Sequence, residues 1–144
     1  MLHPRDRTIE WKRVGERLHI GLHGGHRLSV LVIAQHPIDE RAYLFVLSAL
    51  EHSQTRLVER RHISGPELAH ACRELALQRF GVMARVVLEH WGMRSTMDIG
   101  DIVFTLVDLG LLISQAQDSR NDFYGVFDFE DAFEREYPWS TAHV

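Results

Sequence analysis

The amino-acid sequence predicts a mainly α protein of the α+β class, in which a compact helical domain carries a small β-hairpin near its C-terminus. Several segments have apolar residues at helical spacing, and residues typical of helix ends stand at their borders. After them, residues 126–129 (VFDF) follow a turn-rich stretch and alternate like a strand. Three helices followed by a hairpin is the order of elements in a winged helix, so we expect a winged-helix-like arrangement.

Length and composition indicate one globular domain. The 144 residues are 45% hydrophobic and 25% charged, which is ordinary for a folded domain. We predict a single helical domain over residues 28–138, an N-terminal extension over 1–27 and a C-terminal tail over 139–144. The apolar stretch 28–34 is far shorter than the roughly 20 residues that cross a bilayer. Cys72 is the only cysteine, which suits a reducing compartment, so we expect a cytoplasmic protein with no membrane contact.

The first predicted helix of the domain spans residues 39 to about 59. Asp39 follows Pro37 and is a good N-cap residue. One side of this helix is expected to face the core, through Ala42, Phe45, Val46, Ala49, Leu50 and Ser53.

The second helix begins with the sequence Ser64-Gly65-Pro66-Glu67, which is typical of a capping box. Proline is well suited to a first helical turn because its missing N–H would have no partner there. We expect this helix to end at Phe80, before Gly81.

Two shorter helices are predicted over residues 82–91 and 97–109. In the first, Met83, Val86, Val87, His90 and Trp91 share one side, which we expect to face the core. The second is capped by Ser95 or Thr96 and is followed by Gly110, a typical C′ residue. Together with the other helices they predict a core that includes Phe45, Leu68, Leu75, Val87, Leu88, Trp91, Ile102, Val103, Leu106 and Phe127.

A β-hairpin is expected after Gly110, with the polar segment 117–122 as its turn and residues 126–129 in its second strand. Residues 130–137 are expected to close the domain with a turn of helix. Before the domain, alternating residues around Gly24-Gly25 indicate another hairpin within residues 1–38.

Charge is divided unevenly along the chain. Residues 1–95 carry 14 Lys and Arg against 10 Asp and Glu, whereas residues 96–144 carry 2 Arg against 10 Asp and Glu. We expect the basic and acidic halves to lie against each other in one fold. The alternative is a half that binds polyanions, followed by an acidic tail.

About three quarters of the chain, from residue 28 to residue 138, resembles the Minf-type family of uncharacterised short bacterial conserved hypothetical proteins. The residues that carry the resemblance are RAYLFV at 41–46, HISGPEL at 62–68, FGVMA at 80–84, VLEHWG at 87–92, GDIVF at 100–104, GLL at 110–112, DSRNDF at 118–123 and FDFE at 127–130. The resemblance implies no activity. The resemblance implies a buried helix over residues 28–35. However, residues 28–33 of this chain are LSVLVI, whereas the family has a charged, amphipathic segment at this place. The sequence therefore does not decide between a helix and a strand for residues 28–35.

No motif in the sequence predicts an enzyme, a metal site or a cofactor. His19, His23 and His26 would share one face of a helix, but Gly24-Gly25 disfavours a helix, and no acidic residue or cysteine lies within this cluster. His90 and Cys72 are expected to pack in the core rather than act as base and nucleophile.

The sequence favours a non-enzymatic protein–protein interaction module. In a winged-helix DNA reader the third helix presents basic or amide side chains to the bases. Residues 97–110 instead contain three aspartates and no Lys, Arg, Asn or Gln. The alternative is nucleic-acid binding by another face that carries Arg56, Arg60, Arg61, Arg73, Arg79 and Arg85. The predicted partner-binding residues are Asp118, Arg120, Asn121 and Asp122, with Arg120 expected to pair with the carboxylates that surround it in the sequence.

Overall fold

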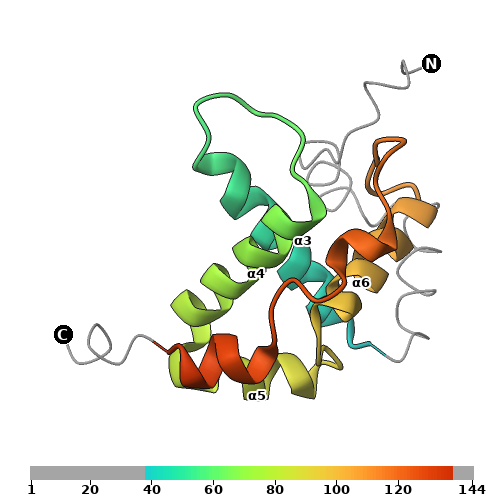
Figure 1. Ribbon diagram of the computed structural model, residues 1–144. Helices are drawn as coiled ribbons and strands as arrows, with labels where there is room; N and C mark the ends of the chain where they lie inside the picture. The colour runs from blue at the N-terminus through green and yellow to red at the C-terminus, as the bar shows by residue number, and fades with distance from the viewer. Residues whose placement is uncertain (1–37, 138–144) are drawn as a thin grey trace.

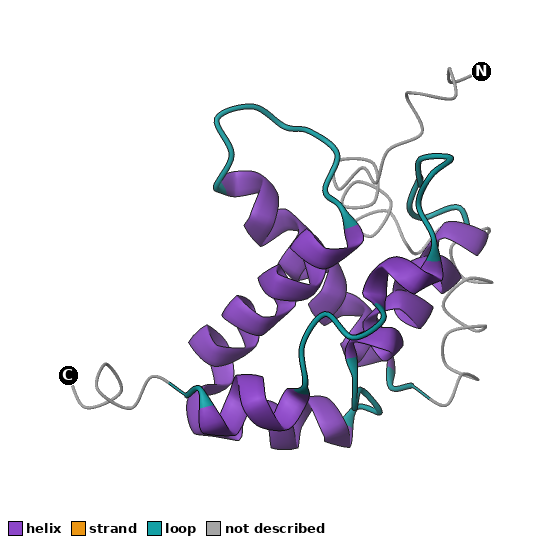
Figure 2. Cartoon of the chain, in the orientation of Figure 1, coloured by secondary structure: helices purple, strands orange, loops and turns teal. Residues whose placement is uncertain are grey.

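The computed structural model describes residues 38–137, and over this range the chain folds into four α-helices joined by short helical turns and loops (Figure 1). No strand occurs within this range (Figure 2). The prediction of a compact helical domain is therefore confirmed, and the β-hairpin expected within residues 111–129 is wrong. Without a hairpin, the described elements do not have the winged-helix order.

Helix α3 (Glu40–Thr55) starts where the sequence predicted. The side chain of Asp39 accepts a hydrogen bond from the backbone N–H of Arg41, which caps the helix. The helix ends earlier than residue 59 because the amide side chain of Gln54 bonds both the N–H and the carbonyl of Arg61. These bonds hold residues 56–63 in a loop instead of a further helical turn.

Helix α4 (Gly65–Phe80) has the predicted capping box. Ser64 Oγ accepts from the N–H of Glu67, and the Glu67 carboxylate accepts in return from the N–H of Ser64. The helix packs across α3 near the middle of the molecule (Figure 1). It stops at Gly81, whose φ of 54° is a backbone conformation that favours glycine.

The predicted core face of the next helix is wrong. Residues Gly81–Met83 form a 3₁₀ turn, η2, and the α-helix α5 (Ala84–His90) begins only after it. A 3₁₀ turn has about 3.0 residues per turn instead of 3.6, so it changes which residues face inward. Ala84 and Leu88 face the core, whereas Val82, Met83 and Val86 are exposed.

Helix α6 (Thr96–Asp108) matches its prediction closely. Asp98 accepts hydrogen bonds from the backbone N–H groups of Arg94 and Ser95 at the start of the helix. At its end, Gly110 takes a φ of 75°, and the N–H of Leu111 bonds the carbonyl of Leu106. This is the Schellman arrangement that the sequence indicated at Gly110.

The chain after α6 forms turns instead of a hairpin. The 3₁₀ turn η3 (Arg120–Phe123) occupies the predicted hairpin turn, and the π-helical turn η4 (Asp131–Arg135) provides the expected helical closure. The apparent alternation at 126–129 does not reflect a sheet. Val126 and Phe127 are both half-buried, and Phe129 is buried together with Phe133, whose ring it meets edge-on at 5.1 Å.

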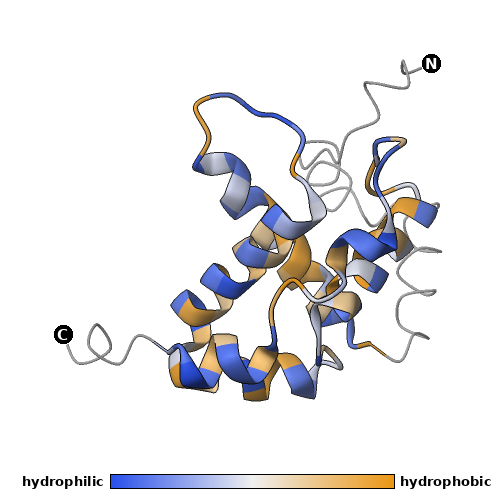
Figure 3. Cartoon of the chain, viewed as in Figure 1, coloured by the Kyte–Doolittle hydropathy of each residue, from blue (hydrophilic) through white to orange (hydrophobic). Residues whose placement is uncertain are grey.

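One apolar core joins these elements. Helix α3 packs against α4 and α6, and η4 covers α4 and α5. Figure 3 shows hydrophobic and hydrophilic residues in narrow stripes around the helices, as expected for elements that bury one side. Of the ten predicted core residues, seven are buried and three are half-buried: Val87, Trp91 and Phe127. No helix among the described residues is long and apolar enough to cross a bilayer.

Several predictions concern residues that the structure does not describe. The hairpin around Gly24-Gly25, the choice of helix or strand for residues 28–35 and the histidine cluster His19, His23 and His26 lie outside residues 38–137. The boundaries expected at residues 27/28 and 138/139 also lie outside this range.

Candidate functional site

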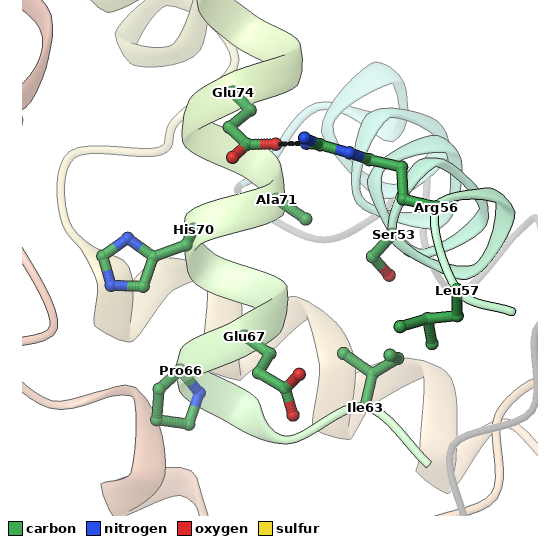
Figure 4. A pocket seen from close by; sticks show the side chains of 9 residues that line it. All are labelled: Ser53, Arg56, Leu57, Ile63, Pro66, Glu67, His70, Ala71 and Glu74. Carbon is green, nitrogen blue, oxygen red and sulfur yellow. Dashed lines mark hydrogen bonds and ion pairs between the residues drawn. The ribbon is translucent and has the colours of Figure 1, made fainter. Parts of the chain in front are cut away.

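An open cleft of about 360 Å³ lies between the end of α3, the loop that follows it and the N-terminal half of α4. Its volume is within the range of roughly 300–1,000 Å³ that is typical of ligand pockets. The residues that line it come from sequence positions 53–74: Ser53, Arg56, Leu57, Ile63, Pro66, Glu67, His70, Ala71 and Glu74 (Figure 4).

The inner surface of the cleft is apolar. Figure 4 shows Leu57 and Ile63 close together on the side facing α4, where Ala71 lies on the helix. Ile63 and Ala71 are also part of the core, so this floor is continuous with the packed interior. The cleft therefore offers a small apolar surface that is rigid because the core supports it.

Charged side chains form the rim of the cleft and are paired with one another. Arg56 makes an ion pair with Glu74 across the gap between the loop and α4. Arg61 Nη2 lies 2.8 Å from Glu67 Oε2. The Arg61 guanidinium, helped by hydrogen bonds from Ser64, lowers the pKa of Glu67 to about 2 although partial burial acts against this. The rim is thus ionised and locally neutral.

The cleft has no arrangement suited to covalent or acid–base chemistry. Its only hydroxyl, Ser53 Oγ, donates a hydrogen bond to the carbonyl of Leu50. The His70 ring points away from Leu57 and Ile63, and it lies 5.6 Å from the ring of Phe127 (Figure 4). Cys72 lies next to Ala71 in sequence, but burial raises the pKa of its thiol far above the usual range, which keeps it protonated. Within residues 38–137, no group of three or more His, Cys, Asp or Glu is placed to hold a metal ion.

The predicted partner-binding residues lie on and beside η3, and Asp118 is used for an internal contact. Its carboxylate lies 3.3 Å from Nε2 of His62, in the loop that borders the cleft. It also accepts from the N–H of Gln115 at 2.6 Å. Only 9% of the Asp118 side chain is exposed, so this carboxylate anchors the segment and has little surface left for a partner.

The Asp122 side chain also makes a hydrogen bond within its own segment of the chain. Its carboxylate accepts from the N–H of Ser119 at 2.9 Å, while Ser119 Oγ accepts from the N–H of Asn121 at 3.1 Å. These bonds close the η3 turn. Asn121 itself is exposed at the tip of the turn.

Arg120 pairs with a carboxylate of its own chain, although not with a neighbouring one as predicted. Its Nη1 lies 2.7 Å from Oδ1 of Asp101 on α6, and its guanidinium lies 5.6 Å from the ring centre of Phe104. Neither Asp118 nor Asp122 is the partner. Because 49% of the Arg120 side chain stays exposed, most of its donors are still open to solvent.

Two glycines allow η3 to lie close to α4 and α6. A Cβ on Gly65 would lie 2.9 Å from Cβ of Asp122, and one on Gly100 would lie 2.9 Å from Cδ2 of Phe123. Thr96 Oγ1 also donates to the carbonyl of Phe123 at 2.5 Å. The η3 turn is therefore held at the first turn of α4, next to Pro66 and Glu67 of the cleft.

Five of the six arginines of the alternative basic face are paired with carboxylates. Arg56, Arg60 and Arg61 pair with glutamates of α3 and α4. Arg73 and Arg85 pair with Glu136 and Glu134 near the C-terminal end of the described chain. These last two contacts join the basic half to the acidic half, as the sequence predicted.

Sequence reasoning missed two exposed features. Tyr124, directly after η3, has 78% of its surface exposed. Val82, Met83 and Val86 are exposed, although Met83 and Val86 were predicted to face the core. The cleft was missed as well, because its walls are close only in the folded chain.

Comparisons with known proteins identify no relative of this chain. No protein family, curated protein or solved structure matches it. The resemblance to the Minf-type family stays a prediction.

Proposed function

We propose that this protein is a non-enzymatic protein–protein interaction module that holds an apolar side chain of its partner in the cleft. The observation that carries the proposal is the apolar floor of Leu57, Ile63 and Ala71 within a rim of paired charges. Such a floor favours an apolar anchor, and a rim whose charges are already satisfied adds little affinity for an isolated ion.

The η3 turn supplies a second contact in this proposal. Arg and Tyr are enriched among the residues that dominate binding energy at interfaces. Arg120 and Tyr124 are both exposed and stand on a turn held beside the first residues of α4. A partner anchored in the cleft can reach this turn across Pro66. In this proposal Arg120, Asn121 and Tyr124 contact the partner. Asp118 and Asp122 maintain the conformation of the segment.

Nucleic-acid binding is the less favoured function. Phosphate contacts need free positive charge, and affinity rises with the number of phosphates neutralised. Ion pairs occupy five of the six candidate arginines, and only Arg79 has no carboxylate partner among the described residues.

The proposal is tested by blocking the cleft and measuring which proteins the chain retains. Ser53→Arg places a long, charged side chain at the cleft wall on α3. Ser48→Arg makes the same change on the same helix but outside the cleft. Both variants are first compared with the wild type by circular dichroism. Each is then immobilised, exposed to a nuclease-treated lysate of the source organism and eluted for mass spectrometry.

We expect to find proteins that bind to the wild type and to Ser48→Arg but do not bind to Ser53→Arg. The same proteins should bind more weakly to Tyr124→Ala. Equal retention by both arginine variants would contradict a role for the cleft. Retention on heparin at moderate salt, lost in Arg79→Ala, would favour nucleic acid instead.

A further inference from the structure

The apolar floor of the cleft is covered in the described structure. Ile63 and Ala71 line the cleft, yet only 1% and 5% of their surfaces are exposed. Figure 4 shows the Leu57 side chain beside Ile63, and Leu57 packs partly buried against the core. An apolar side chain of a partner therefore gains little contact with this floor unless a side chain next to it moves away.

Leu57 belongs to a short loop segment, residues 56–60, which we call the strap. Four of its five residues are exposed, and Val58 is fully so. At one end, the N–H of Leu57 donates to the carbonyl of Gln54 at 3.1 Å. Just after the other end, Arg61 is anchored through its backbone N–H and carbonyl to the Gln54 side chain. Segments with so little buried surface open locally at a low free energy.

Two ion pairs hold the strap against the helices on either side of the cleft. Arg56 pairs with Glu74 of α4, and Arg60 Nη2 lies 3.2 Å from Glu51 Oε2 of α3. These four side chains are 31–60% exposed. Pairs that are so open to solvent contribute little to stability, so a partner can separate them at low cost.

We propose that Leu57 is a built-in occupant of the cleft, and that the strap swings outward when an apolar side chain of the partner takes the place of Leu57 on Ile63 and Ala71. This inference rests on the proposed function and adds the regulation of that site. One apolar side chain replaces another, so the floor stays shielded from water throughout the exchange. The apparent affinity of the cleft is then reduced by the fraction of molecules in which the strap is closed.

Titration of the full chain with N-acetyl-leucinamide, a small probe that carries one apolar side chain, tests the exchange. NMR follows binding at the methyl groups of Ile63 and Ala71. Leu57→Ala should bind the probe at least about tenfold more tightly than the wild type, because a minor open state is populated at about 10% or less. Val58→Ala shortens the neighbouring, fully exposed side chain and should bind like the wild type. Adding Ser53→Arg to Leu57→Ala should abolish binding.

In the wild type, the nuclear Overhauser effect between the methyl groups of Leu57 and Ile63 should weaken as the probe saturates the cleft, while effects from the probe to Ile63 appear. Equal affinities of the wild type and Leu57→Ala would overturn the proposal. A Leu57–Ile63 effect that persists at saturation would overturn it as well, because the probe would then lie beside Leu57 instead of in its place. These measurements need no natural partner, so they separate the strap from the proposed function, which the capture experiment with Ser53→Arg tests.

Discussion

Ser64 and Glu67 show how much local structure a pair of residues can determine. The serine hydroxyl and the glutamate carboxylate each satisfy a backbone N–H at the start of α4, where no preceding helical carbonyl is available. The same glutamate pairs with Arg61, so the loop over the cleft and the helix that forms its wall are joined at one carboxylate.

Ser64→Ala is expected to lower the free energy of unfolding by about 0.5–2 kcal/mol, because the N–H of Glu67 loses its acceptor. The urea midpoint measures the loss at constant slope. Ser48→Ala, a serine within α3 instead of at a helix end, should change the midpoint much less. An unchanged midpoint in Ser64→Ala would mean that the cap contributes nothing.

Glu67→Gln should make the protein less sensitive to acid. The folded pKa of Glu67 is about 2, whereas that of an unperturbed glutamate is about 4.3. The ionised carboxylate therefore stabilises the fold above about pH 4.3, and this stabilisation is lost as the pH falls toward 2. The difference in unfolding free energy between wild type and variant should be constant near pH 7 and should shrink between pH 4.3 and 2. A difference that stays constant over that range would contradict the assignment.

The packing of η3 on α6 depends on Gly100. Within a helix, alanine is favoured over glycine by about 0.8–1 kcal/mol. At position 100, however, the new Cβ would lie 2.9–3.0 Å from three atoms of Phe123, closer than such atoms approach in folded proteins. The backbone of η3 is also held by Thr96, so Phe123 has little room to move.

Gly100→Ala is therefore expected to destabilise the protein despite the gain in helix propensity. The overpacking cost is typically about 1–3 kcal/mol. A double-mutant cycle with Phe123→Ala isolates the clash, because the cost of Gly100→Ala should nearly vanish once the ring is absent. If Gly100→Ala stabilises the wild type, η3 does not lie against α6 as described.

Elements whose ends are specified by nearby residues could be predicted from the sequence. The capping residues at Ser64 and Ser95 and the glycine at position 110 located α4 and α6 almost to the residue. The face of α5 could not be predicted, because a 3₁₀ turn after Gly81 changes the helical phase without a distinct sequence signal. The prediction of a β-hairpin was wrong for a related reason. Phe123, Phe129 and Phe133 are buried by turns that pack on α4 and α6, and this packing outweighs local strand propensity.

The candidate site was less predictable than the helices. The segment 118–122 was recognised as unusual, but its internal bonds involve His62 and Asp101, which are distant in sequence. Turn chemistry explains Ser119 and Asp122, while the contact of Gly65 with Asp122 depends on how α4 meets η3. A cleft whose walls come from α3, a loop and α4 has no local pattern at all.

At the scale of the molecule, the described parts of the basic and acidic halves, residues 38–95 and 96–137, form one body. Arg73 and Arg85 reach Glu136 and Glu134, and His62 reaches Asp118. The two arginine pairs are partly exposed, and pairs of this kind contribute at most about 1 kcal/mol each. The stability of the whole therefore depends mainly on the apolar core that α3, α4, α6 and η4 share.

A single core predicts a single unfolding transition, and Leu106 tests it. Its side chain on α6 is fully buried, so Leu106→Ala should cost about 2–5 kcal/mol through lost burial and an unfilled cavity. Leu44→Ala makes the same change on α3 at a side chain that is 51% exposed, and it should cost far less. Far-ultraviolet circular dichroism reports the helices. With Trp11 and Trp139 replaced by phenylalanine in all proteins compared, tryptophan fluorescence reports Trp91, which packs against Phe45 and Phe80. In Leu106→Ala both signals should shift to the same lower denaturant midpoint, because loss of packing on α6 weakens α3 and α5 equally when they unfold together. Separate midpoints for the two signals would show that α5 and its surroundings unfold independently of the rest of the core.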